Sequence, residues 1–197
     1  MGQEDKRGTA MGLRKTKSIQ VKGKRLTGIL EAHELFFLGK PGGQQADLSG
    51  ADLSGADLSG LILSKMILRG ANLQGSDLRK AKLGATDFSG ANLRKADLRN
   101  TDMTEAVLAG ANLEEAQASG VEFFRCDLSN VNFRKALLRN ANFRLANVKG
   151  AVFTGADMGV TILRETDLSG ANLSGVDLST TLLPRGYSSE QFKQKGA

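Results

Sequence analysis

Apolar side chains recur in this chain at every fifth residue. From Ala46 the sequence reads ADLSG ADLSG ADLSG, and the five-residue frame continues without a slip to Arg185, giving 28 consecutive pentads. The third position is Leu 19 times and Phe five times, the first is Ala 16 times, and the second is Asp or Asn 18 times. This period fits neither an α-helix, with about 3.6 residues per turn, nor the two-residue alternation of a half-buried strand.

A period of five instead predicts a coil that turns a corner in each pentad. The large third side chain and the small first one then point inward, polar side chains face water, and Gly or Asn occupies the corners. Stacked coils would pair their backbones in parallel at a spacing of about 4.8 Å. One coil cannot bury its own interior, so each coil depends on its neighbours. We therefore predict an all-β solenoid over residues 46–185.

The repeated A(D/N)LxG motif resembles that of the pentapeptide-repeat family, and the resemblance covers 140 of the 197 residues. It implies a right-handed quadrilateral parallel β-helix with four pentads per coil, and so about seven coils with a length of roughly 34 Å. Residues twenty apart should then stack in one column. Ala118 departs from the pattern at an inward position, between Leu98 and Leu138, where a thin core is expected unless Phe123 or Phe124 leans in.

The segments outside the repeat are expected to form two ends. Residues 1–25 are interpreted as a basic, disordered tail with a weak strand pattern near its end. Residues 26–45 are predicted to be a short N-terminal capping helix and the loop that leads into the first coil. Residues 186–197 are predicted to be a C-terminal tail or a short capping helix.

The capping helix is expected from Thr27 to Leu38. Thr27 is the expected N-cap, and Gly39 followed by Pro41 should end the helix. The helix should lie over the open first coil, which otherwise exposes unpaired backbone groups and an apolar interior.

Composition and charge narrow the class of protein. The net charge is +6, but residues 1–45 carry +5, residues 46–183 carry −1 and residues 184–197 carry +2. The basic excess therefore lies in the two ends. A single cysteine excludes an intrachain disulfide and favours a reducing, cytoplasmic location. No apolar stretch reaches about 18 residues, so no membrane span is expected.

Candidate chemical groups are few. One His and one Cys exclude a Cys/His metal cluster. His33 is expected to contact the first coil from the capping helix, and Cys126 to replace a small buried residue. All eleven Asp residues of the repeat occupy the second pentad position, which indicates a role in binding backbone N–H groups at the turns. No catalytic, metal or cofactor site is predicted, and the chain is not expected to be an enzyme.

Two surfaces are candidate contact sites. The first is a basic stripe in two clusters, interpreted either as a solvated face with cross-coil salt bridges or as a site for an anionic partner. Its members are Arg79, Lys80, Arg94, Lys95, Arg99, Arg134, Lys135, Arg139 and Arg144. The second is an apolar edge near the last coils, formed by Val160, Ile162 and Leu182, which would hold the C-terminal tail or a second copy of the chain.

The resemblance also bears on function. The best-understood members of the family mimic duplex DNA and bind bacterial DNA gyrase, and that mimicry relies on a strongly acidic surface. The near-neutral repeat and basic ends of this chain disfavour that role. The leading hypothesis is a cytoplasmic, non-catalytic scaffold that binds an undefined protein partner, with a homodimer through the C-terminal end as a further option. The alternative is binding to nucleic acid or an anionic membrane surface through the basic stripe.

Overall fold

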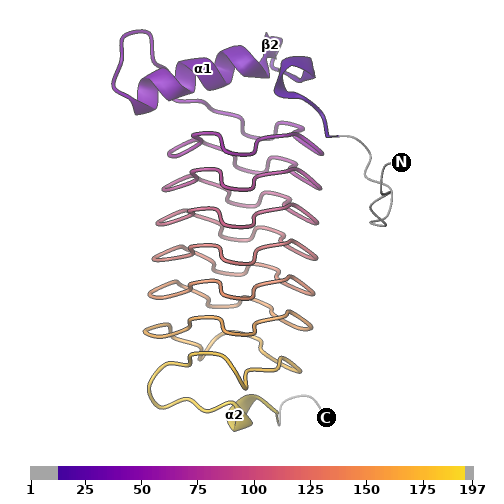
Figure 1. The fold of residues 1–197 in the computed structure, drawn as a ribbon, viewed down its shortest axis with the longest axis vertical. Coiled ribbons are helices and arrows are strands. Elements are labelled where there is room, and N and C mark those ends of the chain that lie inside the picture. The colour runs from indigo at the N-terminus through magenta and orange to yellow at the C-terminus, as the bar shows by residue number, and fades with distance from the viewer. Residues whose placement is uncertain (1–12, 194–197) are drawn as a thin grey trace, which may run out of the picture.

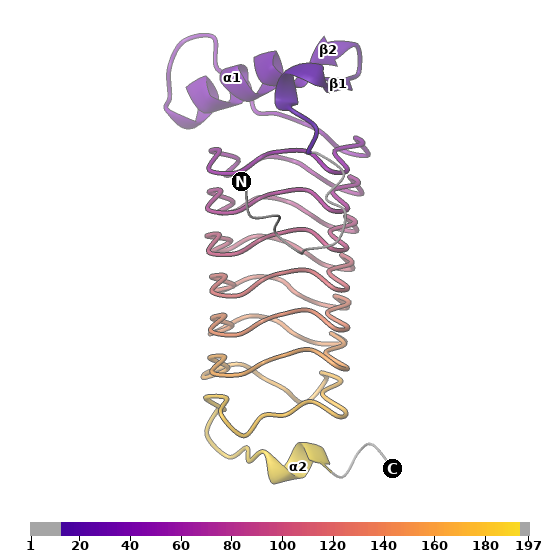
Figure 2. The same cartoon turned by 45° about the vertical axis from the view of Figure 1, so that its right-hand side comes forward.

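The computed structural model describes residues 13–193 and shows a stack of coils with a helix across its N-terminal end (Figure 1; Figure 2). Residues 1–12 and 194–197, which belong to the two expected tails, lie outside the described residues. The regular elements are the 3₁₀ helix η1 (Thr16–Ser18), strands β1 (Gln20–Val21) and β2 (Lys24–Arg25), and helices α1 (Leu26–Phe37) and α2 (Glu190–Lys193). None of the helices in this part of the chain is long and apolar enough to cross a membrane.

The stack, called the rod below (residues 46–185), is held together by parallel β-bridges between residues twenty positions apart. Asp47 bridges Ile67, and Asp57 bridges Asp77. The predicted parallel pairing and column spacing are therefore confirmed. The bridges are isolated, however, and do not extend into strands. The corner after each bridge ends the extended backbone, because the fifth pentad residue adopts a left-handed conformation, as Asn100 does with φ of 58°.

Most pentads repeat one set of hydrogen bonds. Leu48 N–H donates to the Ile67 carbonyl at 2.8 Å, Ile67 N–H donates to the Ala46 carbonyl at 3.0 Å, and a turn bond of 3.0 Å joins Ala51 N–H to the Leu48 carbonyl. The Asp47 carboxylate accepts the Ser49 N–H at 2.9 Å. The predicted backbone role of the second-position Asp residues is confirmed by this bond and its equivalents in other coils.

The core fills the inside of the rod with first- and third-position side chains. Four phenylalanines stack within it: the ring centroids of Phe123 and Phe143 lie 4.9 Å apart, and those of Phe133 and Phe153 lie 5.0 Å apart. Ala118 is completely buried, as is Phe123. Phe124 instead lies half-buried at the surface, with the Arg125 guanidinium over its ring, so of the two phenylalanines only Phe123 enters the interior.

Residues 13–45 form a cap over the first coil (residues 46–65). Arg14 pairs with Ala56 in a parallel bridge: Arg14 N–H donates to the Gly55 carbonyl at 2.7 Å, and Asp57 N–H donates to the Arg14 carbonyl at 2.9 Å. The weak strand pattern expected near the end of the tail falls on β1 and β2, whereas the structure differs from the predicted disorder at residues 13–17. The physical reason is that the open edge of the first coil offers unpaired backbone groups, which this segment satisfies.

Helix α1 begins and ends at defined signals. Its N-cap is Arg25 and not Thr27 as predicted, because Leu26 N–H bonds to the Ile19 carbonyl at 2.9 Å and β2 leads directly into the helix. The predicted stop at Gly39 is confirmed. Gly39 has φ of 65°, its N–H donates to Phe36, and Lys40 N–H donates to Leu35, which is a Schellman motif.

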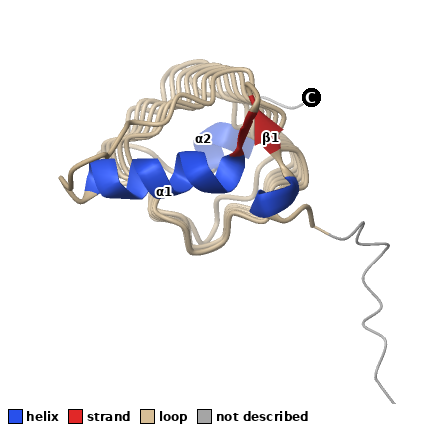
Figure 3. Cartoon of the chain, turned by 90° about the horizontal axis from the view of Figure 1, so that it is seen from above, coloured by secondary structure: helices blue, strands red, loops and turns tan. Residues whose placement is uncertain are grey.

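The helix lies across the end of the rod (Figure 3) and is joined to it through His33. The imidazole is completely buried; its Nδ1 accepts the Ala46 N–H at 3.1 Å and its Nε2 lies 3.0 Å from the Ser64 carbonyl. These contacts require the neutral tautomer with the proton on Nε2. Burial lowers the pKa of His33, which keeps the ring in this form. The prediction that His33 contacts the first coil is confirmed.

The C-terminal end is less tightly joined. In the last coil (residues 166–185), only Asn172 and Leu182 form bridges to the coil before, whereas all four faces are bridged between the coils above it. Four-residue helix α2 follows, and the rings of Tyr187 and Phe192 stack 6.0 Å apart while packing against the core.

Candidate binding surface

A side groove of about 790 Å³ lies along one corner of the rod. It follows the corner down several successive coils, because its lining residues recur at a spacing of twenty. Three cations of the predicted basic stripe meet there with Arg14 of the cap. The lining is Leu13, Arg14, Ser54, Gly55, Asn72, Gln74, Gly75, Ser76, Asp77, Arg79, Lys95, Asp97, Arg99 and Gln117.

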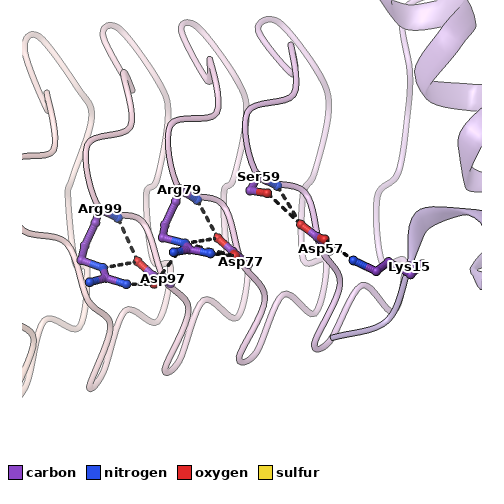
Figure 4. Close-up of polar contacts among 7 residues, drawn as sticks. All are labelled: Lys15, Asp57, Ser59, Asp77, Arg79, Asp97 and Arg99. Atoms are coloured by element: carbon purple, nitrogen blue, oxygen red, sulfur yellow. Dashed lines mark hydrogen bonds and ion pairs between the residues drawn. The ribbon is translucent and has the colours of Figure 1, made fainter. Parts of the chain in front are cut away.

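Carboxylates and cations alternate along one wall of this groove (Figure 4). The Asp77 carboxylate receives two bonds from Arg79, at 2.9 Å from Nε and 2.6 Å from Nη2. Asp97 receives the same pair of bonds from Arg99 at 2.9 and 2.6 Å, and Arg79 Nε also lies 3.6 Å from Asp97. Because consecutive carboxylates share a guanidinium, neighbouring coils are joined by charge as well as by backbone.

The first step of this ladder is made by the cap. Lys15 Nζ donates to the Asp57 carboxylate at 2.9 Å, and Ser59 bonds the other oxygen of Asp57. The hydrogen bond from Lys15 lowers the pKa of Asp57, and that from Arg79 lowers the pKa of Asp77. Both carboxylates therefore stay ionised well below neutral pH. The bond to Asp97 raises the pKa of Arg99.

Lys95 of the groove and most of the other six cations of the predicted stripe have contacts of their own, and Arg139 lies in the same column as Arg79 and Arg99, two coils further on. Arg94 bonds Glu115 at 2.7 Å, and Lys95 lies 3.5 Å from the same carboxylate. Further down the rod, Arg139 approaches Asp157 at 3.3 Å and Arg144 bonds Glu165 at 3.1 Å. Arg134 donates to the side-chain oxygen of Asn132 at 3.3 Å. Lys80 and Lys135 sit at corner positions with φ of 59° and 56°.

The structure therefore brings three of the nine predicted cations, Arg79, Lys95 and Arg99, into one groove and distributes the others over the rod. The sequence interpretation missed Arg14, because its segment was assigned to the disordered tail. No periodic signal precedes Ala46, so the pairing of Arg14 with the first coil had no mark in the sequence.

The predicted apolar edge forms a small surface near the C-terminal end. Ile162 and Leu182 are bridged neighbours on one face, and Val160 lies at the adjoining corner, where its N–H bonds Thr180. Val160 is 45% exposed and Leu182 is 41% exposed. Their role in holding a tail or a second copy stays a prediction.

Reactive groups are few among residues 13–193. Cys126 is buried, its Sγ donates to the Met103 carbonyl, and burial raises the pKa of the thiol to about 12. Such a thiol is a poor nucleophile at neutral pH. Within the same residues, no three His, Cys, Asp or Glu side chains are grouped to hold a metal ion.

Comparison with known proteins agrees with the repeat and the fold. Eight copies of the family described as Pentapeptide repeats match residues 46–84, 86–123, 122–159 and 141–179, so the chain belongs to the pentapeptide-repeat family. The resemblance inferred from the sequence is thereby confirmed. No curated protein sequence matches the chain significantly.

Solved structures of the same family are similar to this one. Trypsin-treated QnrB1, a plasmid-mediated fluoroquinolone resistance protein, has a TM-score of 0.66 and 24% identity, covering 72% of this chain and 71% of its own. HetL, a pentapeptide-repeat protein involved in heterocyst differentiation regulation in the cyanobacterium Nostoc sp. strain PCC 7120, is 28% identical with a TM-score of 0.41, covering 72% and 86% respectively. At 24% identity the likeness to QnrB1 concerns the fold.

Proposed function

We propose that this protein is a non-catalytic scaffold of about seven right-handed coils, located in the cytoplasm, whose side groove binds an extended segment of a protein partner. The observation that carries the proposal is the ladder of Asp77, Arg79, Asp97 and Arg99. Its ion pairs fix polar groups inside a concave surface before any partner arrives. A preorganised surface of this kind loses little side-chain entropy on binding.

The charge of the groove indicates the partner's character. Its lining contains four cations, Arg14, Arg79, Lys95 and Arg99, and two carboxylates, Asp77 and Asp97. A partner segment with an excess of acidic side chains and some polar ones fits this balance. Bare polyanions fit less well, because Arg79 and Arg99 would have to turn away from carboxylates that they already hold. Nucleic acid and anionic membranes are therefore the weaker alternatives.

Modulation of DNA gyrase is disfavoured on the same grounds. Although QnrB1 is a fluoroquinolone resistance protein with a similar fold, a DNA-like surface needs a row of uncompensated negative charge. In this rod the carboxylates of Asp77, Asp97 and Asp157 each face an arginine. A supercoiling assay with gyrase and a quinolone should show neither inhibition nor protection by this chain.

Site-directed photo-crosslinking in the cell of origin tests the groove directly. A photo-reactive phenylalanine analogue replaces Gln74 in the groove or, as the control, Ser169 at the same pentad position on another face. The proposal predicts a discrete protein adduct from position 74 that disappears when Arg79 and Arg99 are both changed to Ala. Equal adducts from both positions, or none from position 74, would contradict it.

A further inference from the structure

A second concave surface lies in the cap, apart from the side groove. This cap pocket, of about 590 Å³, is enclosed by the hairpin of β1 and β2, the N-terminal half of α1 and the segment that leads into the first coil. Its lining is Val21, Lys22, Lys24, Arg25, Gly28, Ile29, Ala32, Gln44, Gln45, Ala46 and Asp47. Small-molecule sites commonly have volumes of about 300–1,000 Å³, so the cap pocket is in the range of a ligand site.

The lining combines an apolar part with a polar wall. Val21, Ile29 and Ala32 supply the apolar surface. Gln44 N–H bonds the Ala32 carbonyl at 2.9 Å, which holds the wall against the helix. The space beside Gly28 is open, since no atom lies within 4 Å of the place that a Cβ would take there. A ligand with an apolar body can therefore enter beside α1.

The cations of the cap pocket differ from those of the rod. Lys22, Lys24 and Arg25 are exposed, and none of them forms an ion pair with another residue of the described chain. The turn between β1 and β2 brings these three cations together at the surface of the cap. Lys22 and Gly23, with φ of 50° and 77°, reverse the direction of the chain there. Helix α1 begins beside them with no side-chain cap and no acidic residue in its first turn.

One carboxylate opposes these three cations. Asp47 lines the pocket. Its pKa is lowered mainly by hydrogen bonds from Ser49 and, to a smaller extent, by the positive charge of Lys22. One of its oxygens is already held by the Ser49 N–H at 2.9 Å. The lining therefore keeps a net charge of three minus one, or +2, beside an apolar surface.

We propose that the cap pocket binds a small organic anion, with a phosphate or carboxylate group held by Lys22, Lys24 and Arg25 and an apolar body against Val21, Ile29 and Ala32. Unpaired cations next to apolar surface in a concave site recognise this chemistry, because charge-assisted bonds orient the anionic group while burial of the body adds affinity. The site is independent of the partner groove, which lies on the side of the rod.

Titration of the full-length, ¹⁵N-labelled chain with three probes tests the proposal. The probes are 1-naphthyl phosphate, 1-naphthoate and the neutral 1-naphthalenemethanol. We expect saturable shifts of the Gly28 and Gln44 amides with at least one anionic probe, and at least about tenfold weaker binding of the neutral one. The better of the two anions identifies the anionic group.

Two variants distinguish a site from diffuse attraction. Lys24→Glu should weaken the anionic probe at least about tenfold, whereas Lys17→Glu, which makes the same charge change on the cap outside the pocket, should change it less than about twofold. Lys22→Asn serves as a second pocket variant should Lys24→Glu disturb the hairpin, because Asn tolerates the left-handed backbone conformation of residue 22. Equal losses in Lys17→Glu and Lys24→Glu, unchanged binding in both pocket variants, or the absence of saturable shifts would overturn the proposal.

Discussion

The cap and the rod both carry many cations, but they use them differently. In the rod, Arg79, Arg99 and Arg144 are held by carboxylates of the same or the next coil. In the cap, Lys15 is held in the same way by Asp57, whereas Lys24 and Arg25 extend from the hairpin without an ion pair inside the described chain. The paired arginines of the rod join residues within a coil or in neighbouring coils, whereas within residues 13–193 Lys24 and Arg25 have no ion pair and can contact the ligand proposed above.

The difference follows from periodicity. An Arg two residues after a second-position Asp lies within reach of its carboxylate, as in Asp77–Arg79 and Asp97–Arg99, so this pairing is built into the pattern. The cap lies outside the repeat and has no neighbouring coil above it. The number of charges in a sequence therefore does not indicate which charged side chains are available to a partner. Their position relative to the repeat does indicate it.

The largest expected effect comes from loosening the cap. Leu26 is completely buried where α1 begins, and Leu26→Ala should cost about 2–5 kcal/mol of local stability. Hydrogen exchange should then accelerate in residues 13–45 and in the first coil. The amides of coils in the middle of the rod should keep their protection, because each coil is supported by its own neighbours. Loss of protection throughout the rod would show that the two regions are not separable.

A second, smaller effect depends on pH. His33 joins cap and rod as a neutral ring, and its pKa in the folded chain is below the ordinary value of about 6.5. The contribution of this contact to stability is fully present above the ordinary pKa of about 6.5. It is lost as the pH falls through the lowered pKa of the folded chain, because protonated Nδ1 cannot accept the Ala46 N–H. The protection factor of the Ala46 amide, which compares its exchange rate with that of an unprotected amide at the same pH, should therefore fall in acid. In His33→Gln this pH dependence should vanish; if it persists, another group is responsible.

A third test removes one guanidinium from the ladder. In Arg79→Ala, Asp77 loses the hydrogen bonds that lower its pKa, so NMR titration of its carboxyl carbon should show a rise toward the ordinary value. Arg134→Ala is the control, since Arg134 contacts an amide oxygen and no carboxylate. An unchanged Asp77 pKa in Arg79→Ala would mean that the rod's ion pairs are not formed in solution.

The smallest effect concerns a polar group inside the rod. Thr86 and Thr161 at the first pentad position each bond a carbonyl 23 residues earlier in the chain, whereas the buried Ser76 hydroxyl has no partner among the described residues. Ser76→Ala should therefore be neutral or stabilising by up to about 1 kcal/mol, while Thr86→Val should cost about 1 kcal/mol. Thermal unfolding of both variants measures the difference. A clear loss of stability in Ser76→Ala would indicate a hydrogen bond at that hydroxyl.

The sequence predicted the rod well because each pentad contains the residues that determine its own conformation. Leu48 and its equivalents mark the inward positions, Asp47 marks a turn bond, and the spacing of the columns follows from four pentads per coil. The sequence did not indicate that the bridges of the rod would be isolated and would not extend into strands. The length of a strand depends on how sharply the backbone turns at residues such as Asn100.

The cap was harder to predict, because its structure depends on contacts between distant segments. Arg14 bonds residues about forty positions away, and the sequence around Arg14 has no feature that indicates pairing with the edge of a coil. The N-cap was misplaced at Thr27 because the hairpin, and not a capping side chain, sets where α1 begins. The cap pocket was missed altogether, since it is lined by a hairpin that weak alternation at residues 18–24 did not reveal.

The exchange rate of arginine Nε–H protons tests the central claim most directly. Arg79 and Arg99 each donate an Nε–H to a carboxylate at 2.9 Å, whereas Arg25 of the cap has no such bond within the described chain. The account predicts slowed exchange with water for the Nε–H of Arg79 and Arg99, and exchange at the rate of a free arginine side chain for Arg25. Equal rates for all three would contradict the distinction between the paired arginines of the groove, Arg79 and Arg99, and the exposed Arg25 of the cap pocket.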